Sequence, residues 1–407
     1  MVSFEVGQYE ILPDFREIKT FQGVTQPDNL IRAKERAEAR GLDDIWDDYV
    51  EATGELALIA YREEIEAAMR TKDLSGISLL GLQDFTGQGT ALVGMMNSHQ
   101  QPKPYDFAKA ERFGSFFKSQ LPLVIMEKYT YETTEKFRAT IRVANFGKKA
   151  VKGKLRYKFE GDKFLKSGCL GERFCPKGDI TDVGSMEVNL AEYKIETAKH
   201  LKLTVMIDGI ENSYSVWIYP PVKPVLSRKI YETKYLDQQA KEILKRGGIV
   251  YLSPDSAPQM LPHSIQAQFT TDFWTVGTFT EQEGGMGQFI DCSHPIFRDF
   301  PTENHSDWQW WCMAVQRAVI LPRRIKTIIA EIDSFVTMRY MAKLFECKCG
   351  GGRLLFSSMG LQNLQQYPEA RVLLDAIYKY MNSEEFVPQQ EMSVEEIEGL
   401  LSAGNQG

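Results

Sequence analysis

Residues 74–96 read LSGISLLGLQDFTGQGTALVGMM, a short apolar run followed by a polar turn that is rich in glycine. The apolar residues 77–82 are too few for a helix and follow a Ser-Gly pair, so they predict a buried strand. Gln83 and Asp84 end this strand, and the glycines of residues 87–89 permit a tight turn or the close approach of a ligand. A parallel strand that presents polar side chains at its carboxyl end is typical of the active-site face of a (β/α) barrel.

The size and charge of the chain limit its class. Its 407 residues favour about two to four domains. A net charge of −7 argues against a dedicated nucleic-acid binder. No apolar stretch reaches the length of about 18 residues that a membrane span needs, and the N-terminus MVSFEVGQYE lacks the basic and apolar regions of a signal peptide. We therefore expect no nucleic-acid or membrane partner, and the sequence leaves the localisation open.

The first 118 residues alternate strands with helices. A short apolar strand at residues 1–5 is followed by helical patterns at residues 28–40, 43–72 and 106–117, with the strand at 77–82 before the last of them. Two buried strands separated by helices predict parallel β/α units, which we interpret as the last two units of a TIM barrel over residues 1–118. A closed barrel needs eight units and about 250 residues, so we expect that the sequence starts in the middle of a barrel or that the other six units come from another chain.

Residues 119–222 change to a period of two. Apolar and basic side chains alternate at residues 137–143 and again at 154–159, with an Asn-Phe-Gly turn between them. This pattern predicts an antiparallel β-sandwich of immunoglobulin-like size, which ends before Pro220-Pro221.

Residues 223–385 return to an α/β pattern. A helix is predicted at residues 236–245, and strands at 249–252, 327–332 and 354–357. The best interpretation is a doubly wound, flavodoxin-like sheet of the class I amidotransferase type. No cysteine lies in a G-x-C-x-G setting, so we expect this domain not to be catalytic. The acidic residues 386–407 are expected to form a tail with one short helix.

The cysteines do not follow a zinc-binding pattern. They occur at Cys169, Cys175, Cys292, Cys312, Cys347 and Cys349. Cys347 and Cys349 share one strand face, where small buried hydrophobic residues are more common than a metal site. Cys169 and Cys175 close a small loop if the compartment is oxidising, and the sequence does not decide this. We expect no metal and no cofactor.

Two further groups of residues have more than one interpretation. The cluster Trp308-Gln309-Trp310-Trp311 suggests a sugar platform or a ligand pocket, but core packing is favoured. His305 with Glu303 and Asp307 is weak evidence for a metal site. Glu5, at the end of the first strand, is a candidate nucleophile or a solvated loop acid. Gln83 and Asp84 bind sugar hydroxyls, or Asp84 caps the following turn.

Several strings resemble a known family. They are EVGQYE at residues 5–10, PDF at 13–15, QGV at 22–24, LLGLQDFTGQGTALVG at 79–94, HPIF at 294–297 and FPTENHSDWQWW at 300–311. The first four resemble the C-terminal barrel units of family 2 glycoside hydrolases, in the beta-galactosidase-like branch. The last two resemble the C-terminal α/β domain of such enzymes. The string at residues 79–94 is the most specific.

The resemblance implies a retaining β-glycosidase that hydrolyses O-glycosyl bonds, with Glu5 as nucleophile. Gln8, Gln83 and Asp84 are implied as substrate-binding residues. The branch usually has His before the nucleophile, where this chain has Phe4. The Asn-Glu pair that carries the acid/base residue in the family occurs nowhere in the chain. We therefore expect the C-terminal part of such an enzyme, whose partners are a carbohydrate and the missing N-terminal half. The alternative is a non-catalytic carbohydrate-binding or accessory protein.

Overall fold

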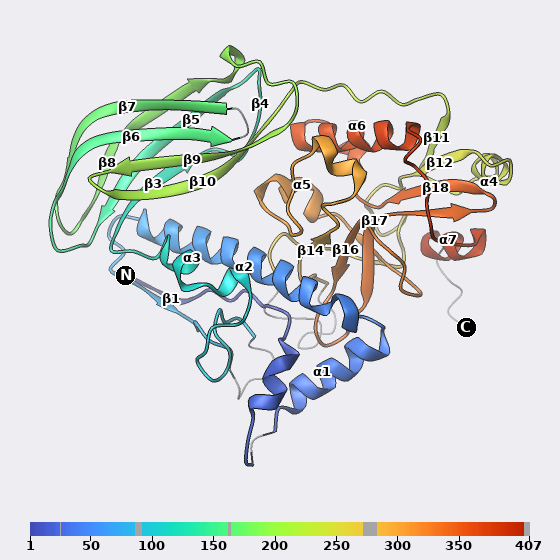
Figure 1. The fold of residues 1–407 in the computed structure, drawn as a ribbon, viewed down its shortest axis with the longest axis horizontal. Helices are drawn as coiled ribbons and strands as arrows, with labels where there is room; N and C mark the ends of the chain where they lie inside the picture. Colours follow the sequence, from blue (N-terminus) through green and yellow to red (C-terminus); the bar gives the residue numbers. More distant parts are fainter. Residues whose placement is uncertain (25, 86–91, 162–163, 272–282, 403–407) are drawn as a thin grey trace.

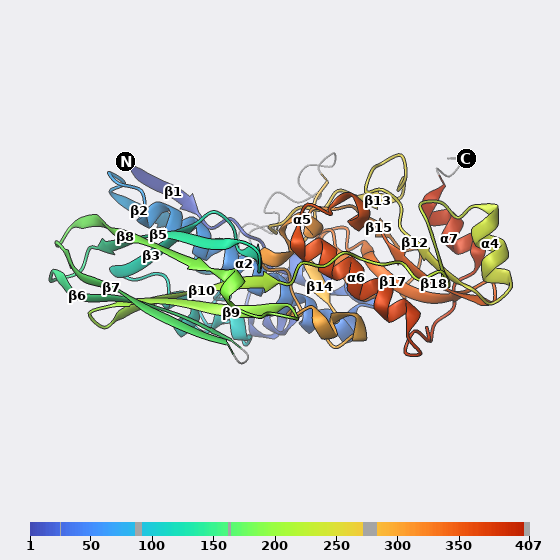
Figure 2. The ribbon, with the colours of Figure 1, turned by 90° about the horizontal axis from the view of Figure 1, so that it is seen from above.

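The computed structural model describes residues 1–24, 26–85, 92–161, 164–271 and 283–402. A β-sandwich lies at one end of the elongated molecule and a mixed sheet with its helices lies at the other (Figures 1 and 2). The long helix α2 (Trp46–Met69) runs along both (Figure 1). The protein therefore combines mixed α/β parts with an all-β part, as the sequence pattern predicts.

The N-terminal segment contains two parallel strands. β1 (Val2–Val6) pairs with β2 (Gly76–Leu79), and the helices α1 (Asp28–Ala39) and α2 lie between them in the chain. This is the β/α order that the sequence predicts, although β2 is shorter than expected. Within the described ranges the two strands pair only with each other, and no closed barrel forms. Met1, Val2 and Phe4 are exposed, so apolar side chains remain uncovered at this sheet.

The helix boundaries differ from the sequence pattern in two places. The helix predicted from residue 43 begins as the 3-10 turn Asp43–Ile45 and becomes α-helical at Trp46. The helix predicted at residues 106–117 is split, because Lys109 has an extended backbone between the 3-10 turn Asp106–Ala108 and α3 (Ala110–Gly114). None of the helices within the described residues is long and apolar enough to cross a membrane.

The sandwich is built from two sheets over one core. One sheet has the order β3-β5-β8 and the other β4-β10-β9-β6-β7. Phe137 and Phe159 come from the two sheets and meet edge to face, with ring centroids 4.9 Å apart. The pairing is antiparallel except that β4 runs parallel to β10. The strands are β3 (Gln120–Met126), β4 (Thr130–Glu132), β5 (Lys136–Asn145), β6 (Val151–Gly161), β7 (Phe164–Cys175), β8 (Asp179–Asn189), β9 (Lys199–Ile207) and β10 (Ile210–Tyr219).

The third part is a mixed sheet and not the doubly wound parallel sheet that the sequence suggests. Only β11, β12 and β18 pair in parallel, and β17 is antiparallel to β18. The reason is a hairpin: Cys349 pairs with Gly352, and Gly350 and Gly351 between them both have positive φ, so the turn is too short for a parallel crossover. The elements are β11 (Ile230–Thr233), α4 (Gln238–Lys245), β12 (Ile249–Leu252), β13 (Ser264–Ile265), β14 (Gln288–Ile290), α5 (Trp311–Ala314), β15 (Ala318–Ile320), β16 (Ile329–Ile332), β17 (Tyr340–Cys349), β18 (Gly352–Ser357), α6 (Pro368–Asn382) and α7 (Val394–Leu401).

Residues 386–402 pack onto this sheet, although their composition predicts a tail. The main-chain N–H of Lys348 donates to Gln390 at 2.8 Å, and the N–H of Met392 donates back to Lys348 at 3.0 Å. Met392 and Ile397 are buried. Because α7 also carries acidic side chains, the composition of this segment does not reveal its buried apolar residues.

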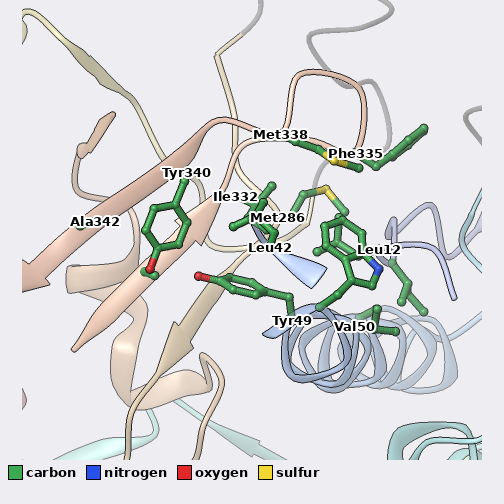
Figure 3. Packing of buried hydrophobic residues seen from close by; sticks show 14 of the residues in the cluster. Leu12, Leu42, Tyr49, Val50, Met286, Ile332, Phe335, Met338, Tyr340 and Ala342 are labelled. Atoms are coloured by element: carbon green, nitrogen blue, oxygen red, sulfur yellow. The ribbon is translucent and has the colours of Figure 1, made fainter. Parts of the chain in front are cut away.

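The first and third parts share one hydrophobic core. Tyr49 and Val50 of α2 lie against Met286, Ile332 and Tyr340 from the mixed sheet (Figure 3). Leu12 and Leu42 fill the same core from the segments before and after α1 (Figure 3). The N-terminal segment is therefore stabilised by burial against the third part.

A buried carboxylate joins α2 to the sandwich. The side chain of Glu66 accepts hydrogen bonds from Arg62 at 2.9 Å, from the amide of Asn212 at 3.0 Å and from the hydroxyl of Tyr214 at 2.7 Å. The Arg62 guanidinium also lies over the Tyr214 ring, 4.5 Å from its centroid. Because Glu66 is buried, its charge depends on these partners.

We expect Glu66→Ala to lower the free energy of unfolding by about 3–5 kcal/mol, because it leaves Arg62 and two polar groups without their buried acceptor. Urea unfolding followed by tryptophan fluorescence measures the loss. Glu38→Ala is the matched control, since Glu38 is exposed and lies 3.6 Å from Lys34 in an i,i+4 pair, and we expect a change within about 0.5 kcal/mol. Equal losses in both variants contradict the role of Glu66.

Candidate functional site

Helix α2 holds the carboxyl ends of β1 and β2 through Tyr61. The Tyr61 hydroxyl donates toward the main-chain oxygens of Gly81 and Val93, at 3.1 and 2.9 Å. Its ring lies against Gly7, which has φ of +91°, and a Cβ at Gly7 would come within 1.9 Å of the ring. Gly7 is therefore needed both for the backbone conformation and for the space beside Glu5.

Glu5 occupies a strained and exposed position near the end of β1. The register of β1 against β2 shifts between Ser3 and Val6, and Glu5 has φ of +57° within this bulge. Its carboxylate accepts a hydrogen bond from the Gln8 side chain at 3.0 Å. A non-glycine residue in the left-handed region costs about 1–2 kcal/mol and is found often at functional sites. The structure thus brings together two of the four predicted site residues, Glu5 and Gln8.

Asp84 is committed to contacts within the protein. Its buried carboxylate lies 2.9 Å from the ammonium group of Lys103 and accepts a hydrogen bond from the N–H of Gly94 at 2.8 Å. Burial raises the pKa of Asp84, and the Lys103 charge opposes this. Gln83 is half-buried and pairs through its main chain with Met96. These contacts favour the structural interpretation of Asp84, and its role in binding substrate stays a prediction.

The residues 87–89 of the predicted glycine loop lie outside the described residues. Close to Asp84 the structure adds a residue that the sequence pattern missed. Glu17 is buried in the 3-10 turn Phe15–Thr20, and burial together with the Asp84 charge raises its pKa to about 7. The available signal was a carboxylate two residues after the PDF string, which periodicity does not distinguish from a surface acid.

The tryptophan cluster divides between core and surface. Trp310 is fully buried, and its indole N–H donates to Thr302 at 2.9 Å. Trp308 is stacked between Tyr129 and Phe269, with centroids 4.9 Å away on each side. Trp311 is exposed. The covered faces of Trp308 favour the packing interpretation over a flat sugar platform, because stacking on a sugar needs a free ring face.

A polar cavity lies beside this cluster. It has a volume of about 410 Å³ and is formed where α2, β10 of the sandwich and residues 303–308 meet. A second cavity of about 730 Å³ continues from it between α2 and the sandwich. Their shared lining residues are Ile59, Arg62, Arg112, His200, Tyr214 and Ser215. We name the two cavities together the junction groove.

Two ionisable groups at the junction groove have shifted pKa values. Burial raises the pKa of Asp307 to about 8, although hydrogen bonds from Gln309 oppose the shift. Burial also lowers the pKa of His305, against the charges of Glu55 and Glu303. The lowered pKa favours the neutral imidazole of His305. Among the residues that the structure describes, no group of three His, Cys, Asp or Glu side chains is arranged to hold a metal ion.

All six cysteines lie within the described residues and are free thiols. Cys169 and Cys175 therefore do not form the loop-closing disulfide that the sequence leaves open. Burial raises the pKa of Cys349 to about 11 and raises that of Cys312 and Cys347 further. Thiols that stay protonated are poor nucleophiles and metal ligands.

Two family models match parts of this chain. Residues 231–402 match a domain of unknown function, DUF8487, and residues 135–220 match another domain of unknown function, DUF8488. No curated protein matches. Each model covers less than half of the chain, and neither description assigns an activity.

Solved structures show only distant similarity. The endo-beta-1,4-mannanase from Thermotoga petrophila matches with a TM-score of 0.21 and 10% identity over 41% of this chain and 36% of its own. A mutant of Bacteroides uniformis beta-glucuronidase 2 matches at 0.19 and 11%, over 33% and 22%. Spo0M, a sporulation control protein from Bacillus subtilis, matches at 0.20 and 12%, over 65% and 100%. The chain thus spans about a third or less of either glycoside hydrolase, and TM-scores of this size assign no family.

We expect the stability of the protein to depend on Asp307 and pH. A carboxyl whose pKa is raised from 3.8 to about 8 in the folded state binds more protons there, so its contribution to stability is present below about pH 4 and is lost as the pH rises toward 8. Asp307→Asn keeps the acceptor for the Gln309 N–H, 3.0 Å away, without a charge. Its melting temperature relative to the wild type is therefore expected to increase between pH 5 and pH 8.

Each pKa unit of the shift corresponds to about 1.4 kcal/mol, so differential scanning fluorimetry resolves even one unit. Asp299→Asn is the matched control, because Asp299 is exposed on the same segment. The interpretation of Asp307 is wrong if the two variants differ from the wild type by the same amount at every pH.

Proposed function

We propose that this chain supplies the nucleophile side of a retaining β-glycosidase site, of the beta-galactosidase-like branch of family 2. In this proposal residues 1–118 are the last two units of a TIM barrel. An immunoglobulin-like sandwich over 119–222 follows them, and then the mixed α/β part that begins at residue 223. The observation that carries the proposal is the exposed Glu5 carboxylate, held in a left-handed backbone conformation near the carboxyl end of a parallel strand.

The contacts of Glu5 suit a nucleophile. The Gln8 side chain donates a hydrogen bond to one of the two carboxylate oxygens of Glu5. The backbone strain at Glu5 is maintained by the close packing of Gly7 on Tyr61. A position that is strained and still oriented by its neighbours is preorganised for attack on a bound substrate.

The proposed reaction needs a second carboxyl group. In a retaining enzyme the nucleophile attacks the anomeric carbon, the bond to the leaving oxygen breaks, and an acid 5–5.5 Å away protonates that oxygen. Water then hydrolyses the glycosyl ester, with the same acid acting as base. Because the Asn-Glu pair is missing from this sequence, residues outside it supply the acid and the other six β/α units in this proposal. The exposed Met1, Val2 and Phe4 are where these units pack.

Carbohydrate binding without catalysis is the second candidate function. The observation that favours it is the junction groove, which lies within this chain and needs no partner. The two functions predict different behaviour of the isolated protein.

We expect the isolated chain to hydrolyse no aryl β-galactoside, β-glucuronide or β-mannoside, because the Asn-Glu pair that carries the acid/base residue of the family is missing from its sequence. Co-expression with the polypeptide of the adjacent upstream reading frame is expected to give hydrolysis, and Glu5→Gln is expected to lower kcat by about three orders of magnitude or more. With nitrophenyl glycosides as substrates, the release of nitrophenol measures hydrolysis by the complex and by its Glu5→Gln variant.

Glu35→Gln is the matched control, since Glu35 is exposed on α1. The proposal is overturned if the Glu5→Gln complex retains wild-type turnover. It is also overturned if the isolated wild-type chain already turns over these substrates.

A further inference from the structure

We propose that the junction groove is a second saccharide site, which binds a neutral oligosaccharide independently of Glu5. The groove is bordered by α2 and α3 on one side and by β9 and β10 of the sandwich on the other. Each of its two cavities falls in the size range of about 300–1,000 Å³ that is typical of sites for small organic ligands. Their continuity suits a chain of several sugar rings better than a single small ion.

The α-helical wall of the groove is held rigid by ion pairs. Arg112 forms a bidentate ion pair with Glu55, in which one nitrogen-to-oxygen distance is 2.7 Å. Arg112 also forms an ion pair with Asp106 at 3.0 Å. Arg62 is bound to Glu66 at 2.9 Å. Side chains fixed in this way present donors and acceptors in defined positions, which lowers the entropy cost of binding.

The sandwich wall contributes an amphipathic surface, which includes the charged residues Glu160 and Lys202. His200 is stacked on Trp217 with ring centroids 4.8 Å apart, and its Nε2 lies 2.9 Å from the Ser215 hydroxyl. Burial lowers the pKa of His200, so at pH 7 the ring has one donor and one acceptor nitrogen. Imidazole and hydroxyl groups both donate and accept hydrogen bonds. They therefore suit sugar hydroxyls, which also donate and accept hydrogen bonds.

The charges of the lining disfavour ionic ligands. Both arginines of the lining are paired with carboxylates, Arg62 with Glu66 and Arg112 with Glu55. Glu63 of the same wall is paired with Arg70. An anionic ligand therefore competes with these carboxylates for the guanidinium groups, and a cationic ligand competes with the guanidinium groups for the carboxylates. A neutral polyhydroxylated chain gains hydrogen bonds from both signs of charge without burying a charge of its own.

The test is isothermal titration of the full chain with cellotetraose, β-1,4-mannotetraose and β-1,4-galactotetraose, and with inorganic phosphate and a tetragalacturonate as anionic probes. At least one neutral tetrasaccharide is expected to bind with a Kd of about 1 mM or lower. His200→Ala and Glu303→Gln are each expected to weaken it about tenfold, as expected for the loss of one or two hydrogen bonds. Glu211→Gln is the matched control, because Glu211 is exposed on the same strand as Ser215 and does not line the groove.

The result is independent of the proposed glycosidase site. Glu5→Gln is expected to leave this binding unchanged, so loss of hydrolysis and loss of groove binding are separate outcomes. The inference is overturned if no neutral tetrasaccharide binds or if an anionic probe binds more tightly. It is also overturned if the groove variants bind like Glu211→Gln, or if Glu5→Gln alone removes binding.

Discussion

The buried carboxylate of Glu66 holds helix α2 and the β-sandwich together. It lies on α2, and its partners come from α2 itself and from strand β10 of the sandwich. A charge that is removed from water must be compensated by hydrogen bonds, and Asn212 and Tyr214 of the sandwich provide two of these to Glu66. The network therefore gives the contact a defined orientation, which apolar packing by itself specifies less strictly.

Helix α2 carries a different neighbour on each of its other faces. Tyr49 and Val50 face the core of the mixed sheet, whereas Tyr61 holds the ends of β1 and β2. A helix that is covered on several sides lacks one clean apolar stripe, because polar residues such as Glu66 are also buried. Both candidate sites depend on this helix. Gly7, two residues after Glu5, packs against the Tyr61 ring, and the helix face that carries Arg62 lines the junction groove.

The two candidate sites differ in how complete they are. Glu5 is exposed on a two-stranded sheet with uncovered apolar neighbours, and its chemistry depends on a group from elsewhere. The junction groove is lined by several segments of the same chain that are far apart in sequence. In the proposed function, the groove binds carbohydrate and Glu5 supplies one half of a catalytic site.

Local patterns predicted the elements whose own residues determine them. The strand at residues 249–252 and the glycine end of α1 follow from apolar runs and from the positive φ of Gly41. The prediction of a parallel third sheet was wrong, because the direction of β17 is set by a two-residue glycine hairpin whose flanking strands were not recognised as a pair. Residues 386–402 were misjudged as a tail, since burial of Met392 and Ile397 depends on a sheet that their own composition does not reveal. For the candidate site, the family resemblance predicted Glu5 and Gln8, and the structure places their side chains within hydrogen-bond distance. The ion pair of Asp84, the buried Glu17 and the junction groove arise from residues that are distant in sequence, and only three-dimensional packing decides which polar side chains lose water and which partners replace it.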